Sequence, residues 1–424
     1  MRPPPASNPS RPWYREVTGE QWRAFVAAYL GWMLDGFDFT ILTFLLVEIQ
    51  RTFTVNSALA GALGTATLLL RVVGGIGAGT AADRWGRKGP LMLSILWYSV
   101  FAGLGGFSTS YGALFACRAL FGIGMGGVWA AGMPLALEHW PARLRGTASG
   151  LLQGGYAMGF ILSALVYQYA YPAVARHVDE AWRVMLWIGV VPALVVLWIA
   201  RSVTESPVWL ARASQAAAGD AAGAGFSVTR LFTPALRGVT AHTSLLMAAF
   251  LFLYQAITFW YPTLLTQMGR RTLPFLVAFN AGAVAGNIIC GRLSETRIGR
   301  RGAASLATLV GLLGVPLFIF ASGTIPLLAG AAIVGAFGTG NFGVVPGYLS
   351  ERFPTDVRAG GAGFAYHVGA ALAAIAPSFV GRLVDGGVPL AQAMAGSIAV
   401  SGALVIVIMW LGPETRGRTL VAAP

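Results

Sequence analysis

Long apolar runs alternate with short polar segments along the whole chain. Each run is roughly 20 to 30 residues long, and about 20 apolar residues are enough for a helix to cross the hydrocarbon core of a bilayer. Twelve such runs can be marked, at residues 22–49, 57–81, 89–108, 111–135, 147–171, 182–201, 238–267, 273–292, 302–322, 325–349, 360–383 and 388–411. The pattern predicts an all-α membrane protein with twelve transmembrane helices.

The connections between these runs differ in their content of basic residues. Alternate connections are rich in arginine, from residues 2–23 at the N-terminus to 416–418 at the C-terminus, whereas the intervening ones hold few basic residues. Because basic residues are enriched in the cytoplasmic loops of membrane proteins, the arginine-rich set is expected to be cytoplasmic. We therefore predict a multi-pass protein of the inner or plasma membrane with both termini in the cytoplasm.

The composition excludes several classes of protein. Hydrophobic residues make up 56% of the chain and charged residues 11%, far fewer charges than the roughly 25% of a soluble domain. The formal net charge of +13 is distributed over short loops, which indicates topology rather than a nucleic-acid surface. Cys117 and Cys290 both lie in apolar runs, so neither a disulfide nor a metal site is expected. We expect a monomer in the lipid bilayer, without a cofactor.

Two loop motifs occur twice, about half a chain apart. The spacing E-x-x-P-x-x-x-R at 138–145 recurs at 351–358, 213 residues later. The motif G-x-x-x-D at 79–83, followed by basic residues, recurs as G-x-x-x-E at 291–295, 212 residues later. A repeat of this period predicts a duplicated unit, and hence two six-helix bundles related by pseudo-two-fold symmetry.

The duplication divides the chain into five segments. These are a cytoplasmic N-terminal tail (1–21), an N-terminal bundle (22–201), a cytoplasmic linker (202–237), a C-terminal bundle (238–411) and a cytoplasmic C-terminal tail (412–424). The middle of the linker, 213–226, is rich in Ala and Gly, which predicts a flexible connection.

Four ionisable residues lie well inside the apolar runs: Asp35, Asp38, Arg71 and Arg118. An acid at the centre of a membrane helix costs roughly 2.5–3.5 kcal/mol, so such residues indicate function by default. Asp35 and Asp38 are three residues apart and share one helix face. Asp35 and Arg71 each lie about 18 Å from the predicted cytoplasmic surface, so they can pair. Arg118 can pair with Asp38 or with Glu48.

The internal repeat supplies a comparison for these charges. Shifted by 212 or 213 residues, the four positions fall on Met247, Phe250, Ala283 and Ala331. The scaffold therefore does not need charges at these places, which favours a functional role. A charge network that only ties the N-terminal bundle together is the alternative.

The loop motifs resemble those of the major facilitator superfamily. The G-x-x-x-D-R-x-G-R-K motif at 79–88, the six-plus-six duplication and T-E-S-P-V-W-L at 204–210 carry this resemblance. The segment D-G-F-D-F at 35–39, together with E-x-W-P-x-x-L-R at 138–145, is similar to the sialate/lactate (monocarboxylate) proton symporter branch. The D-G-x-D pair also resembles the aromatic-acid proton symporters. The resemblance implies import of a small organic carboxylate with protons by alternating access.

The residue types predict a division of roles at the membrane centre. The planar guanidinium of arginine can donate two parallel hydrogen bonds to a carboxylate. A buried aspartate can take up and release a proton. We expect Arg71 or Arg118 to bind the anion and Asp35 or Asp38 to couple the proton. Further substrate-binding candidates are Tyr254, Gln255 and Asn341, followed by His367, Tyr366, Tyr156 and Asn287. For each of these, a hydrogen bond between helices is the alternative, and for His367 a solvated or packing position.

The repeated loops are expected to act as gates. Charged residues there can pair on the cytoplasmic face when the two halves close, and pairs worth about 0–1 kcal/mol each bias a conformational equilibrium. The gating candidates are Asp83, Arg84, Arg87, Glu138, Arg145, Glu295, Arg300, Glu351 and Arg358. Glu138 with Arg145, and Glu351 with Arg358, can make such charge pairs in the same way as the 83–87 segment.

Other functions stay as alternatives to proton-coupled carboxylate import. The segment at 204–210 suggests a sugar facilitator, although intramembrane charges argue against one. A drug exporter is disfavoured because the fifth helix lacks G-P-x-x-G-G. A transporter-like sensor without flux is the alternative from another class. An enzyme is not expected, since the sequence shows no nucleotide-binding loop, no metal-ligand spacing and no nucleophile–base pair.

Overall fold

The computed structural model describes residues 13–140, 145–217, 228–294, 296–353 and 358–416. Twelve helical spans in these residues are long and apolar enough to cross a membrane, which confirms the predicted number. They are Gly19–Phe53, Ser57–Ala82, Lys88–Gly106, Tyr111–His139, Leu151–Ala175, Ala181–Ser202, Arg237–Gln267, Thr272–Ser294, Gly299–Phe320, Thr324–Leu349, Gly361–Asp385 and Leu390–Leu411.

Seven helices build the N-terminal half. They are α1 (Gly19–Phe53), α2 (Ser57–Trp85), α3 (Lys88–Gly106), α4 (Tyr111–His139), α5 (Arg145–Ala175), α6 (Ala181–Ile188) and α7 (Pro192–Ser202). Side chains cap three of the long helices: Thr18 accepts the N–H of Gln21 at the start of α1, Asn56 caps α2 and Ser110 caps α4. The sixth span consists of two helices because Pro192, at the start of α7, has no backbone N–H to donate to the hydrogen bond of a continuous helix.

The C-terminal half repeats this plan with more interruptions. Its elements are α9 (Arg237–Thr258), α10 (Tyr261–Gln267), α11 (Thr272–Ser294), α12 (Gly299–Val315), η4 (Pro316–Phe320), α13 (Thr324–Ile333), η5 (Val334–Thr339), η6 (Gly340–Gly343), α14 (Val345–Arg352), α15 (Arg358–Ala373), α16 (Ala376–Asp385) and α17 (Leu390–Leu411). Prolines lie at the starts of α10, η4, α14 and α16 and explain these breaks. Broken helices are common where a transporter builds its binding site.

Two segments depart from the predicted boundaries. The N-terminal tail was expected to reach residue 21, but the Thr18 cap starts α1 at Gly19. In the linker, α8 (Pro207–Ala217) includes Ala213–Ala217, so this part of the segment predicted to be flexible is helical. The short helix η3 (Val228–Phe232) precedes α9, and residues 218–227 lie outside the described residues.

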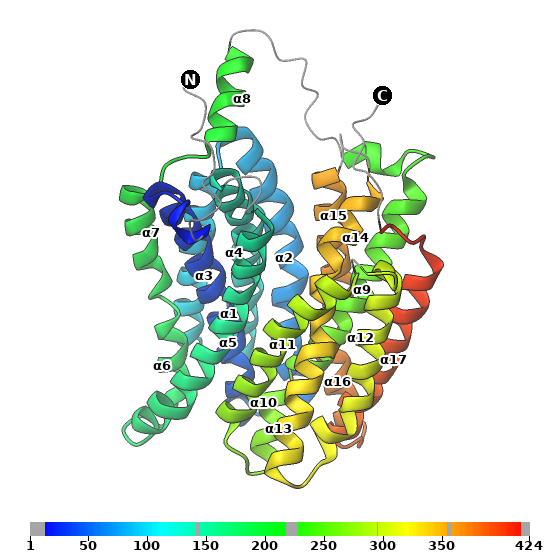
Figure 1. Ribbon diagram of the computed structural model, residues 1–424. Helices are drawn as coiled ribbons and strands as arrows, with labels where there is room; N and C mark the ends of the chain where they lie inside the picture. Colours follow the sequence, from blue (N-terminus) through cyan, green and yellow to red (C-terminus); the bar gives the residue numbers. More distant parts are fainter. Residues whose placement is uncertain (1–12, 141–144, 218–227, 295, 354–357, 417–424) are drawn as a thin grey trace.

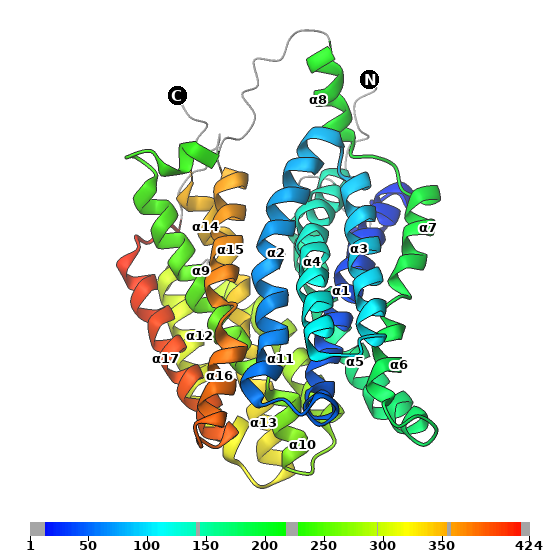
Figure 2. The same cartoon turned by 180° about the vertical axis from the view of Figure 1, so that it is seen from behind.

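The two halves lie side by side, with α2 against α15 and α16, and α5 against α11 (Figures 1 and 2). We call the end where α1 begins and α17 ends the terminal end, and the other the distal end. At the distal end the halves touch directly: the Asp385 carboxylate accepts the N–H groups of Ser57 and Ala58 at 3.0 and 2.8 Å. A Cβ on Gly61 would lie 2.5 Å from the carbonyl oxygen of Pro377, so glycine permits this approach.

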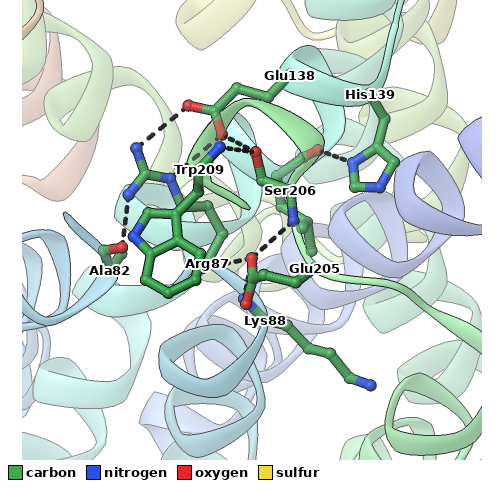
Figure 3. A network of polar contacts seen from close by, with 9 residues as sticks. Ala82, Arg87, Lys88, Glu138, His139, Glu205, Ser206 and Trp209 are labelled. Atoms are coloured by element: carbon green, nitrogen blue, oxygen red, sulfur yellow. Dashed lines mark hydrogen bonds and ion pairs between the residues drawn. The ribbon is translucent and has the colours of Figure 1, made fainter. Parts of the chain in front are cut away.

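Charged side chains at the terminal end form one network within each half, and Figure 3 shows the network of the N-terminal half. In the N-terminal half, the Arg87 guanidinium donates to Glu138 at 3.2 and 3.3 Å, and Glu205 accepts the N–H of Arg87 at 2.7 Å. Ser206 donates to the same Glu138 carboxylate. The network ties the start of α3 to the end of α4 and to the segment after α7.

The C-terminal half has the same network at equivalent positions. Arg300 donates to Glu351 at 2.8 and 3.3 Å, and Glu414 accepts the backbone N–H groups of Arg300 and Arg301. Burial raises the pKa of Glu414, but hydrogen bonds from four backbone N–H groups outweigh it and hold the pKa below its ordinary value. The matched networks show the duplication at the level of individual side chains.

These networks give the observed partners of four of the predicted gating residues. Glu138 pairs with Arg87 and Glu351 with Arg300, each within one half. The side chains of Asp83, Arg145 and Arg358, and residue Glu295, lie outside the described residues. Arg84 is exposed and lies over the ring of Trp85 at 5.6 Å. The observed pairs join helix ends inside a bundle and do not bridge the two halves.

Candidate functional site

Asp35 on α1 and Arg71 on α2 lie buried in the middle of the molecule. Their exposed fractions are 0% and 5%. Both carboxylate oxygens of Asp35, and the Nε and Nη2 atoms of Arg71, are buried without a hydrogen-bond partner. The two groups are close enough to interact electrostatically, but no ion pair within 4 Å joins them in the described part of the chain. A buried polar group without a partner is costly, so these atoms are poised to bind something else.

Aromatic rings from both halves surround the Arg71 guanidinium. The Trp32 ring centroid lies 5.3 Å from Arg71 Cζ, and the Tyr366 ring of α15 lies 5.9 Å from it. Tyr156 of α5 packs against Trp32 at 5.0 Å, and Tyr254 of α9 lies within electrostatic reach of Arg71. Arg71 therefore lies between the two halves, inside a cage of flat side chains.

Trp129 closes this cage from α4. Its ring stacks on Tyr366 with a centroid distance of 5.0 Å and an interplanar angle of 5°, which joins the N-terminal half to the C-terminal half. Trp32 and Trp129 also line one crevice together with Ala28 and Met133. The indole N–H groups of Trp32 and Trp129 are buried and donate to no acceptor.

His367 lies beside the same cage. The imidazole packs edge-on against Trp129 at 5.8 Å, and a Cβ on Gly75 would lie 2.4 Å from His367 Cε1. Glycine at 75 therefore makes room for this ring, one helical turn from Arg71 along α2. The His367 side chain is 5% exposed and its Nδ1 atom has no partner. The structure thus places His367 in the interior, not in a solvated position.

Asp38 and Arg118 form a second buried pair, inside the N-terminal half. Arg118 Nη1 donates to the backbone carbonyl of Asp38 at 3.2 Å, and the Asp38 carboxylate oxygens have no hydrogen-bond partner. A Cβ on Gly189 would lie 2.6 Å from Asp38 Oδ1, so this carboxylate points toward the break between α6 and α7. Glu48, the other partner expected for Arg118, pairs with Arg51 instead. The two acids predicted to share a face thus lie in different surroundings.

The remaining candidates fall into three groups. Tyr156, Tyr254 and Tyr366 lie within electrostatic reach of Arg71 and belong to its site. Asn341 is fully buried and its Nδ2 atom donates to Thr308 at 2.8 Å, so it ties η6 to α12. Gln255 and Asn287 each keep a buried amide oxygen without a partner.

Sequence reasoning missed the two tryptophans of the site. Trp32 precedes Asp35 by three residues and so shares its helix face, a signal that could have identified it. Trp129 lies in a glycine-rich stretch of α4 with no polar neighbour in sequence. Its role becomes visible because the fold brings α4 against Tyr366 of α15.

Comparison with known proteins identifies the family. The sequence profile described as Major Facilitator Superfamily matches residues 28–377, most of the chain. The chain belongs to the major facilitator superfamily. The protein is therefore a multi-pass membrane protein with the twelve-helix fold that the sequence predicted.

Relatives of this protein are named as transporters, which supports the expectation that it is not an enzyme. It is 35% identical to the "Probable 4-methylmuconolactone transporter" of Cupriavidus pinatubonensis, over 96% of this chain and 93% of that protein. It is 30% identical to the "Sialic acid transporter NanX" of Escherichia coli, over 86% of this chain and 88% of that protein. Among solved structures, the inward open conformation of the xylose transporter XylE from E. coli matches with a TM-score of 0.74, 20% identity, and coverage of 94% and 98% of the two chains.

Proposed function

We propose that this protein imports a small organic carboxylate together with a proton by alternating access. The observation that carries the proposal is Arg71, which is buried between the halves with unpaired Nε and Nη2 atoms beside the unpaired Asp35 carboxylate. A guanidinium with two free donors on one edge matches the two oxygens of a carboxylate. One relative is named as a sialic acid transporter and another as a probable 4-methylmuconolactone transporter, and the first of these names supports an acidic substrate.

Asp35 is proposed as the proton carrier. Burial disfavours an ionised Asp35 and the charge of Arg71 opposes this effect, so in this scheme Asp35 is ionised only while Arg71 holds no acid. A bound carboxylate neutralises Arg71, so Asp35 loses its cationic neighbour and takes up a proton. Acid and proton then cross together, and the departure of the acid restores the Arg71–Asp35 interaction and releases the proton. Asp38, which lies apart with Arg118, is the second candidate.

The surroundings of Arg71 favour a flat substrate. Trp32, Tyr366 and Trp129 present ring faces and edges at close range, and such surfaces pack best against a planar, conjugated acid. The aromatic-acid symporters that the D-G-x-D segment resembles fit this reading. A sialate-like acid, which is bulky and not planar, is the second candidate because one relative is named for it.

The site opens alternately to the two sides in this proposal. The distal end is closed by the Asp385 contacts and by Thr65 with Ser378, whose hydroxyls lie 2.7 Å apart. By the distribution of arginines, the terminal end faces the cytoplasm. The protein is then placed in the inner or plasma membrane with both termini inside.

The orientation can be tested by cysteine labelling. In a background with Cys117→Ala and Cys290→Ala, Thr109→Cys places a thiol in the loop after α3 at the distal end, and Thr296→Cys one after α11 at the terminal end. Both positions are exposed. An impermeant maleimide added to intact cells should label Thr109→Cys and leave Thr296→Cys unlabelled until the cells are opened. The reverse pattern would overturn the orientation.

Transport measurements on liposomes that contain the purified protein test the function. Radiolabelled conjugated acids, saturated acids of the same size and sialic acid are offered with an inward proton gradient. We expect a conjugated acid to accumulate above its outside concentration and a protonophore to abolish the accumulation. Uptake that only equilibrates, and that the gradient leaves unchanged, would indicate a facilitator and contradict proton coupling.

A further inference from the structure

Apart from the Trp32 indole N–H, the unpaired donors around Arg71 form two sets. Arg71 contributes its Nε and Nη2 atoms, which the proposed function uses for one carboxylate. Trp129 stacks on Tyr366 and His367 packs over Gly75, and they contribute a buried indole N–H and a buried imidazole Nδ1, both without a partner. A single carboxylate on Arg71 leaves this second set unsatisfied.

A chain of short contacts joins the two sets. Arg71 Cζ lies 5.9 Å from the Tyr366 ring, Tyr366 stacks on Trp129 at 5.0 Å, and Trp129 meets His367 at 5.8 Å. Along α2, Gly75 lies four residues from Arg71, about 6 Å along the helix axis. Tyr366 thus contacts both Arg71 of the first set and Trp129 of the second.

The chemistry of the second set selects the group that it accepts. The Trp129 donor is neutral, and His367 lies close enough to Arg71 for the two to repel when both are charged. A neutral carbonyl oxygen can accept from such groups without a second buried charge, whereas a second carboxylate would add a charge that has no cation of its own there. The second set therefore suits a ketone, ester or lactone carbonyl.

We propose that the site takes an acid with two ends, a carboxylate on Arg71 and a neutral carbonyl on Trp129 and His367. This inference rests on the proposed function, since it assumes that Arg71 holds the carboxylate. It makes Trp129 and His367 the residues that discriminate between acids of similar size and planarity. An acid without the second oxygen leaves both donors unpaired and binds more weakly.

Three ligands that share one six-carbon conjugated chain test this inference. Sorbate carries one carboxylate, trans,trans-muconate carries two, and the monomethyl ester of trans,trans-muconate carries one carboxylate and one neutral carbonyl. Binding to the purified wild-type protein in nanodiscs is measured by calorimetry. We expect the monoester to bind roughly three- to tenfold more tightly than sorbate, the gain of one or two neutral hydrogen bonds. If trans,trans-muconate, the dianion, binds more tightly than its monomethyl ester, the proposal that the second set accepts a neutral carbonyl is wrong.

Two conservative variants assign the effect to the second set. Trp129→Phe keeps a ring against Tyr366 and removes the indole N–H, and His367→Phe keeps a ring over Gly75 and removes both nitrogens. Each should reduce the ratio of monoester affinity to sorbate affinity, and the far-UV circular dichroism spectrum checks that the fold is intact. Trp97→Phe is the matched control, since the Trp97 N–H donates to Leu120 at 2.8 Å, away from the site.

The outcomes separate this inference from the function on which it rests. If wild type binds sorbate and the monoester equally, or if both variants keep the full monoester advantage, the second set is not a binding site, although carboxylate recognition stands. If wild type binds none of the three acids but does bind sialic acid, both the proposal of a planar substrate and this inference are wrong. If it binds no carboxylate at all, the proposed function falls as well.

Discussion

Asp35→Asn should abolish accumulation of substrate while exchange continues. Asparagine imitates protonated aspartate permanently, so the variant has no proton to release after the acid has left. For an acid and proton carried one to one, an inward gradient of one pH unit supports roughly tenfold accumulation. We expect this factor to be lost in Asp35→Asn, whereas labelled and unlabelled acid still exchange across the liposome membrane. Uptake with and without the gradient, and counterflow, measure the two properties.

Asp38→Asn is the matched comparison, because it makes the same change three residues away. Asp38 lies inside the N-terminal half, near Gly189, and not beside Arg71. If Asp35→Asn accumulates substrate as the wild type does while Asp38→Asn cannot, the proton travels on Asp38 and the assignment is wrong. Loss of exchange in Asp35→Asn would instead place this residue in substrate binding.

Arg71→Lys should weaken binding of the acid substantially, although it keeps the positive charge. Lysine offers a point charge in place of two parallel donors, so the two-point contact with the carboxylate is lost. Hydrogen bonds to charged groups are worth about 1.5–3 kcal/mol, which predicts a loss in affinity of roughly 10- to 100-fold. Calorimetric titration of the purified variant with the best acid of the panel measures this loss.

Arg118→Lys and an uncharged substrate serve as the two controls. The Arg118 guanidinium donates to the Asp38 carbonyl within one bundle, so we expect Arg118→Lys to change acid affinity far less than Arg71→Lys. The primary amide of the same acid should bind wild type and Arg71→Lys about equally. Full carboxylate affinity in Arg71→Lys, with a large loss in Arg118→Lys, would move the anion site to Arg118.

Much of the fold could be predicted from the apolar runs and their spacing. Most span ends lie within a few residues of the predicted ones because charges and prolines at the membrane surface limit how far a span extends. Two differences have local reasons: the Thr18 cap begins α1 earlier than expected, and the Ala-rich residues Ala213–Ala217 continue α8 into the segment that was expected to be flexible. The internal repeat predicted the symmetry that the Arg87 and Arg300 networks show.

The site was harder to predict because its members come from six helices in both halves. Depth along a helix could place Asp35 level with Arg71, but not show that Asp38 turns toward Gly189. Spacing along the chain did not indicate that Arg87, from the loop between α2 and α3, pairs with Glu138 at the end of α4. Trp129 could not be foreseen, because packing of α4 against α15 is what makes it part of the site.

The central claim is that binding of an acid at Arg71 drives uptake of a proton by Asp35. Calorimetric titration of the purified protein near pH 7, in two buffers with different enthalpies of ionisation, counts the protons taken up per acid bound. We predict about one proton for the wild type, about one for Asp38→Asn and none for Asp35→Asn. Equal uptake in wild type and Asp35→Asn, or no uptake in the wild type, would contradict the account.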